Sequence, residues 1–151
     1  MRELNLKEII EYAEKIELES FSFYKKATEI VNEPEVKDVL SQLATEETEH
    51  YNRLRGLLEE GKLSKEELEK TINIEKTLLE MLINTDEIET SFSALDVLNI
   101  ALKREKNTAK AYEMFKTFTA LDDFALKVFE DLRLQEVGHV NKISARLKKY
   151  E

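Results

Sequence analysis

The sequence contains no cysteine, and this absence excludes several kinds of site. Disulfide bonds, zinc sites built from thiolates, iron–sulfur clusters and rubredoxin-type iron centres all need cysteine sulfur. Glycine and proline are also scarce, with 3 and 1 residues among 151, whereas Glu, Lys and Leu are abundant. This composition is typical of an all-α protein, and the length suits a single domain over residues 1–151.

Long apolar runs and an excess of positive charge are missing as well. No run of 18 apolar residues occurs, and the N-terminal sequence MRELNLKEIIEYAEK has no apolar signal-peptide core. We therefore expect a soluble, cytoplasmic protein that does not enter a membrane. The net charge of -9 argues against nucleic acid or an anionic membrane surface as the main partner.

Four segments have the apolar period of helices that pack in a bundle. They are predicted to run from Leu6 to Val31, from Pro34 to Glu60, from about Ser93 and from about Asp122. The core-facing positions of the first are Ile10, Ala13, Glu17, Ser20, Tyr24, Ala27 and Val31. Gly61 is expected to end the second helix, while Ser93 and Asp122 are expected N-caps of the third and fourth.

Acidic and imidazole side chains interrupt these core-facing rows, where apolar residues are expected. A buried carboxylate is costly unless something compensates its charge. The second and fourth helices each carry Glu-x-x-His, which puts a carboxylate and an imidazole on one helix face. A lone Glu on each of the other two helices completes the ligand set of a di-iron carboxylate four-helix bundle. The six candidate metal ligands are Glu17, Glu47, His50, Glu105, Glu136 and His139.

The two halves of the chain repeat one helical hairpin. A shift of 88 residues places Glu17 on Glu105 and Tyr24 on Tyr112, and a shift of 89 places the first Glu-x-x-His on the second. We expect hairpins over residues 6–60 and 93–149 to face each other about a pseudo-twofold axis. The candidate ligands would then meet at one level of the bundle.

Residues 61–92 separate the hairpins and are too many for a tight turn. We expect a long crossover between the second and third helices. Ser64 and Glu67 indicate a short capped helix over about 65–71. A second apolar stretch is expected to be helical and to cover the bundle or another subunit: it contains Ile74, Leu78, Leu79, Met81 and Leu82.

Simpler interpretations remain beside the functional ones. The bundle could be a structural module whose metal site has been lost. Tyr24 and Tyr112 could be ordinary core tyrosines, or their hydroxyls could hydrogen-bond ligand carboxylates, and the two readings are compatible. Off the core-facing rows, Glu19, Glu46 and Glu49 are expected on the solvated face.

These residues resemble the rubrerythrin family of the ferritin-like superfamily over the four helices. The resemblance implies an antiparallel ferritin-like bundle with two Fe ions, for which Mn or Zn are alternatives. It implies that Glu47 and Glu136 bridge the metals. Glu17 and His50 would complete one metal, and Glu105 and His139 the other.

Two departures from that family bear on activity. Rubrerythrins carry a further carboxylate one turn after the third-helix Glu, which takes part in a redox-linked ligand change, and this sequence has Thr108 there. The family's rubredoxin domain is also missing, because the chain has no cysteine, so electrons would come from a separate donor protein.

The resulting hypothesis is a di-iron oxidoreductase that reduces hydrogen peroxide or dioxygen. The alternative is an iron-binding or sequestering protein without turnover. A di-manganese catalase-like activity is a minor alternative. Family members are often dimers, so a homodimer is expected. The ligands themselves would carry the chemistry, with no separate catalytic residue.

Overall fold

The computed structural model of the chain describes residues 2–59, 61–75, 77, 87–118 and 123–150. Four long helices make up most of it: α1 (Leu6–Ile30), α2 (Pro34–Glu59), α5 (Ala94–Phe118) and α6 (Asp123–Leu147). The smaller elements are β1 (Arg2–Asn5), α3 (Lys65–Glu69), β2 (Thr71–Ile74) and the 3-10 helix η1 (Lys148–Tyr150). The all-α class predicted from the composition is therefore confirmed.

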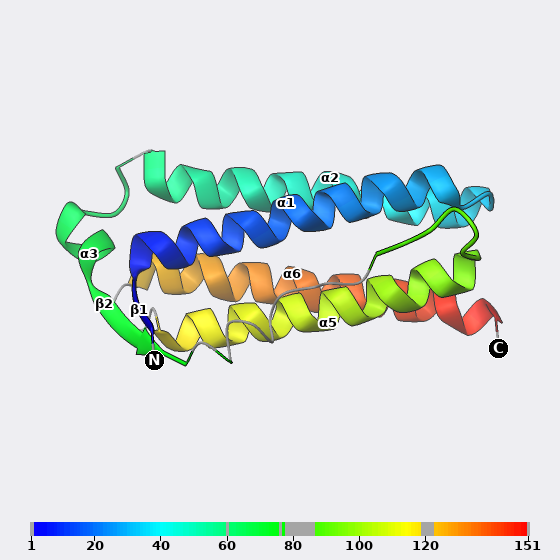
Figure 1. Cartoon of the computed structure of the whole chain (residues 1–151). Coiled ribbons are helices and arrows are strands. Elements are labelled where there is room, and N and C mark those ends of the chain that lie inside the picture. Colours follow the sequence, from blue (N-terminus) through cyan, green and yellow to red (C-terminus); the bar gives the residue numbers. More distant parts are fainter. Residues whose placement is uncertain (1, 60, 76, 78–86, 119–122, 151) are drawn as a thin grey trace.

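The long helices form two antiparallel hairpins that lie against each other. In Figure 1, α1 and α2 form the upper pair and α5 and α6 the lower pair. Helix α1 contacts α5, and α2 contacts α6, so the pairs close into a four-helix bundle. Helix α2 ends at one end of the bundle and α5 begins at the other, as the long predicted crossover requires (Figure 1).

Local sequence explains where the helices begin and end. Ser93 Oγ accepts from the backbone N–H of Asp96 at 3.1 Å, and the Asp96 carboxylate accepts from the N–H of Ser93 at 3.0 Å, a reciprocal cap before α5. Asn5 and Glu8 form the same arrangement before α1. After α2, Gly61 has φ 64°, a left-handed conformation that favours glycine. The predicted N-cap Asp122 lies outside the described residues.

The start of the crossover contains one predicted element and one that the sequence did not reveal. Ser64 caps α3 as predicted, although that helix ends at Glu69 rather than near residue 71. The helix expected from Ile74 onward is wrong at that residue, because Thr71–Ile74 is a strand paired antiparallel with Arg2–Asn5. The other members of that apolar stretch, Leu78, Leu79, Met81 and Leu82, lie outside the described residues.

Two apolar cores fill the bundle, one toward each end. The first lies beneath the β1–β2 ribbon and includes Leu4, Ile74, Phe115 and Phe129. The second lies toward the other end and includes Leu40, Leu43, Leu98 and Ile143. Between the two cores, α1, α2, α5 and α6 each contribute buried polar side chains.

Crossing a bilayer requires a helix that is both long and strongly apolar. Within the parts of the chain that the structure describes, none of the helices meets both conditions.

Candidate metal centre

The six candidate ligands all lie in the polar layer between the two cores. Each comes from the middle of a long helix and lies on the core-facing side of that helix. None is more than 4% exposed, so the layer is closed to bulk solvent. The fully or nearly fully buried members are Glu17, Glu47, His50, Glu105, Glu136 and His139.

These side chains form two overlapping groups of four. One group contains Glu17 and His50, the other contains Glu105 and His139, and both contain Glu47 and Glu136. In each group one ligand atom per residue lies within 4.8 Å of the others. The structure thus brings together all six residues singled out in the sequence, with Glu47 and Glu136 in the shared position.

The two imidazole rings point the same nitrogen into this layer. His50 Nδ1 lies 3.0 Å from Glu136 Oε1 and 3.4 Å from Glu17 Oε2. His139 Nδ1 lies 3.0 Å from Glu47 Oε1 and 3.4 Å from Glu105 Oε2. The rings are nearly parallel, with an angle of 11° and centroids 5.5 Å apart, as a pseudo-twofold relation between the halves predicts.

Each tyrosine hydrogen-bonds a lone glutamate of the opposite hairpin. The hydroxyl of Tyr24 donates to Glu105, and that of Tyr112 donates to Glu17. Both tyrosines are fully buried, so the core interpretation and the carboxylate interpretation hold together. Burial, and then the charge of the facing glutamate, raises the pKa of each tyrosine well above its usual value, so the hydroxyls stay protonated donors.

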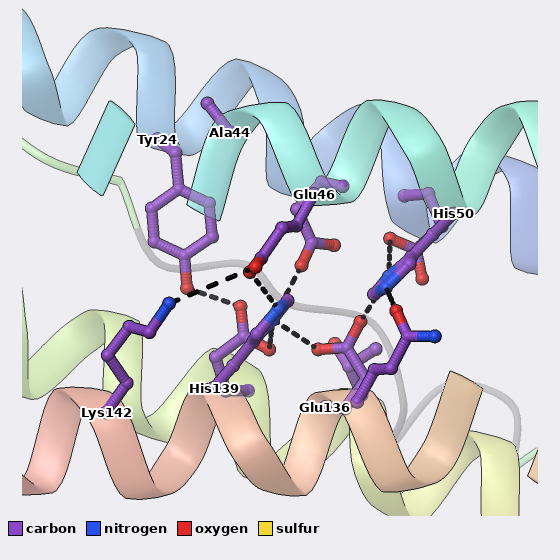
Figure 2. Close-up of polar contacts among 12 residues, drawn as sticks. Tyr24, Ala44, Glu46, His50, Glu136, His139 and Lys142 are labelled. Atoms are coloured by element: carbon purple, nitrogen blue, oxygen red, sulfur yellow. Dashed lines mark hydrogen bonds and ion pairs between the residues drawn. The ribbon is translucent and has the colours of Figure 1, made fainter. Parts of the chain in front are cut away.

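The other nitrogen of each imidazole, Nε2, points away from the layer and contacts a side chain of the opposite hairpin. His139 contacts Glu46 (Figure 2), with Nε2 lying 2.6 Å from Oε2, and His50 Nε2 lies 2.6 Å from Gln135 Oε1. The prediction of a solvent-exposed position is confirmed for Glu19 and Glu49. It holds only in part for Glu46, whose side chain is 38% exposed but reaches from α2 to His139 on α6.

Sequence reasoning missed Glu46 and Gln135 because neither lies on a core-facing row. One signal could have found them: each directly precedes the Glu of a Glu-x-x-His, and the repeat places one on the other.

The pKa values of the buried glutamates and histidines depend on how closely the four carboxylates lie to one another and to the imidazoles. Burial, followed by the charges of the neighbouring carboxylates, raises the pKa of Glu47 and of Glu136 well above the usual value. Burial opposes ionisation of Glu105 too, but hydrogen bonding with Glu136 and His139 outweighs it and lowers the Glu105 pKa. Burial also works against charged imidazoles, yet the facing carboxylates raise the pKa of His50 and His139.

The donor set fits divalent metal ions. Four buried oxygens of the candidate ligands accept no hydrogen bond within the described residues: Glu17 Oε2, both oxygens of Glu47 and Glu136 Oε2. Buried oxygens without donors are costly, and bound cations remove that cost. Two divalent ions would balance the four carboxylates, and carboxylate with imidazole is a ligand chemistry that Fe, Mn and Zn accept.

Thr108 contributes no ligand to this layer. Its side chain is 1% exposed, and Oγ1 donates to the backbone oxygen of Arg104 at 3.0 Å, one turn earlier on α5. The layer therefore has four carboxylates, and the position of the fifth family carboxylate holds a hydroxyl that is bonded to its own helix.

Comparisons with known proteins identify the family and the fold. The sequence model of the rubrerythrin family matches residues 8–147. A crystal structure from Thermotoga maritima, described as a candidate ferritin-like diiron-carboxylate protein, has a TM-score of 0.79 and 19% identity, covering 100% of this chain and 99% of that one. This likeness confirms the predicted ferritin-like fold. A search of curated proteins finds no match.

Proposed function

Because the chain belongs to the rubrerythrin family, we propose that the buried layer binds two iron ions and that the protein is a di-iron carboxylate oxidoreductase. Its substrate would be hydrogen peroxide or dioxygen, and a separate protein would supply electrons. The observation that carries the proposal is the pair of overlapping four-residue groups that share Glu47 and Glu136. Two such groups with common members suit two ions side by side.

The assignment of ligands follows from the two groups. Glu17 and His50 would bind one ion, Glu105 and His139 the other, and Glu47 and Glu136 both. When bound, a pair of ferrous ions supplies two electrons, the number that reduces one hydrogen peroxide with two protons to two waters. Six protein side chains shared by two ions would not fill every coordination position, so a small oxidant could bind there.

The chain's own residues would hold and shield the centre. Tyr24 and Tyr112 fix the orientation of Glu105 and Glu17 through their hydroxyls, and their pKa values keep the donor protons in place. The two apolar cores close the layer toward both ends of the bundle and exclude water. Exclusion of water strengthens the attraction between carboxylates and cations.

Metal content and peroxide response test the proposal. The protein is reconstituted with Fe(II) without oxygen, its metal is quantified per chain, and optical spectra are recorded before and after hydrogen peroxide. Two irons per chain, with a ferric band that appears with peroxide, disappears on reduction and returns over repeated cycles, is the expected result.

Other outcomes separate the alternatives. A single stoichiometric oxidation, with no continuing consumption of peroxide in the presence of several electron donors, would favour iron binding without turnover. No bound metal after reconstitution would contradict the ligand assignment and leave only the helical bundle.

A further inference from the structure

The two halves of the centre differ in charge at one pair of repeat-related residues. The candidate ligands and the tyrosines are identical in type between the halves. Directly before Glu47, however, the chain has Glu46, whereas directly before Glu136 it has Gln135. Each contacts the histidine of the opposite hairpin, so one imidazole faces a carboxylate and the other an amide.

Both contacts are made to Nε2, the nitrogen that is not directed into the layer. His139 Nδ1 and His50 Nδ1 face the buried carboxylates at 3.0 Å, where an ion held by those carboxylates would take the Nδ1 lone pair. The ring proton then remains on Nε2. It faces Glu46 Oε2 at 2.6 Å in one half and Gln135 Oε1 at 2.6 Å in the other.

We propose that Glu46 makes the metal position of Glu105 and His139 bind more tightly than the position of Glu17 and His50. The inference rests on the proposed function. A carboxylate in ion-pair contact with Nε2 stabilises positive charge on the ring more strongly than a neutral amide oxygen does, and the imidazole becomes a better electron donor to its metal. Glu46 is thus a positioning residue that acts through His139.

The charged side chains around Glu46 and Gln135 balance in both halves, so the halves differ in where the carboxylate lies and not in net charge. Beside Glu46, Lys142 Nζ lies 3.9 Å from Oε1 (Figure 2). The repeat places Arg53 at the matching position on the other side, where it pairs with Asp131 at 2.8 Å. Each side therefore has one cation and one carboxylate, Glu46 with Lys142 and Asp131 with Arg53. Of these two carboxylates, Glu46 contacts a histidine in the described residues, whereas Asp131 is paired with Arg53.

Variants that keep one metal position at a time test the proposal. Glu17→Ala leaves the position of Glu105 and His139, and Glu105→Ala leaves that of Glu17 and His50. Each is titrated with Co(II) by calorimetry. In the Glu17→Ala protein we expect Glu46→Gln to weaken Co(II) binding about 10- to 100-fold. In the Glu105→Ala protein the same change should leave affinity unchanged, while Gln135→Glu should strengthen it.

The control is Glu49→Gln, which removes the same charge from an exposed residue of α2. If it weakens binding as much as Glu46→Gln, or if Glu46→Gln weakens both positions equally, the proposal is overturned. Should a single-position variant fail to fold, Gln135→Glu in the otherwise native chain supplies the answer: two separate Co(II) binding steps should converge, and their unchanged separation would contradict the proposal.

These outcomes are distinct from failure of the proposed function. Two Co(II) ions bound with no response to Glu46→Gln would overturn only the inference about Glu46. No Co(II) binding by the native chain would contradict the metal centre itself.

Discussion

The hydroxyl of Tyr24 donates a hydrogen bond to Oε1 of Glu105, although 81 residues separate the two along the chain. The hydroxyl of Tyr112, in the second hairpin, likewise donates to Glu17 in the first. Each hairpin therefore holds the lone glutamate of the other through a tyrosine hydroxyl. The polar layer depends on both halves being in place.

Tyr112→Phe should destabilise the metal-free protein. The change removes the donor to Glu17 and leaves a buried carboxylate oxygen without it, which costs about 1–3 kcal/mol of unfolding free energy. Urea unfolding of the metal-free protein measures this loss. Tyr150→Phe is the control, because the same hydroxyl is removed from a residue that is 43% exposed. Equal stability of the two variants would show that the Tyr112 contact contributes nothing.

Removal of shared and unshared ligands should have different effects on metal content. Glu136 belongs to both groups of four, so Glu136→Ala should lose both ions, whereas Glu105→Ala should lose one and keep the other. Metal quantified per chain after reconstitution distinguishes these results.

The matched control for these variants is Glu19→Ala, which removes an exposed glutamate of α1 and should retain both ions. Equal metal loss from Glu136→Ala and Glu105→Ala would contradict the overlapping groups. Retention of both ions by each variant would support a site elsewhere.

The β1–β2 ribbon should contribute to stability through Ile74. This side chain is 2% exposed within the first core, and Ile→Ala changes at such sites cost about 2–5 kcal/mol. Thermal and urea unfolding of Ile74→Ala should show a loss in that range. Ile72→Ala, at a half-buried position of the same strand, should lose less. If Ile74→Ala is as stable as the native chain, the ribbon does not cover the core.

Stability should respond to pH through an ion-pair network between α5 and α6. Hydrogen bonds from Arg133 and Lys116 lower the pKa of Glu130 to about 2. Because this pKa lies below its unfolded value, Glu130 stabilises the fold above about pH 4.5, and the contribution is lost as pH falls toward 2. Glu130 is partly exposed, so solvent screening limits the effect to about 1 kcal/mol.

Glu130→Gln should therefore lower the melting temperature at pH 7 and have little effect near pH 2. Thermal unfolding of the native and variant proteins at both pH values measures this difference. Glu66→Gln, at an exposed position of α3, is the control and should change little at either pH. A deficit of the same size at pH 7 and pH 2 would mean that packing, and not charge, explains the effect.

The long helices and the centre could be predicted because their signals are periodic. Glu17 and His139 stand at positions where a helix that packs in a bundle needs an apolar residue, and that conflict identifies them from the sequence alone. The repeat added the expectation that the halves face each other. Ser93, Asp96 and Gly61 marked helix ends through local backbone chemistry, which depends on few neighbours.

The features that were missed depend on contacts between distant segments. Strand β1 has four residues, Arg2–Asn5, and forms only because Thr71–Ile74 lies beside it. Glu46 on α2 contacts His139 on α6, and the spacing of apolar residues within α2 cannot reveal a contact with another helix. Predictions made from one segment at a time therefore find the candidate ligands and miss residues, such as Glu46, that contact them from another helix.

The distances along the chain between contacting residues have a consequence for the order of folding. Helices α1 and α2 are separated by three residues, so their contacts are local, whereas Tyr24 and Glu105 are 81 residues apart. Contacts that close short loops form sooner than those that close long ones. We expect each hairpin to form first and the two to dock last, which brings the carboxylates together only in the final step. Under the proposed function, the complete iron site exists only after this docking step, so bound iron would stabilise the docked pair of hairpins rather than either hairpin alone.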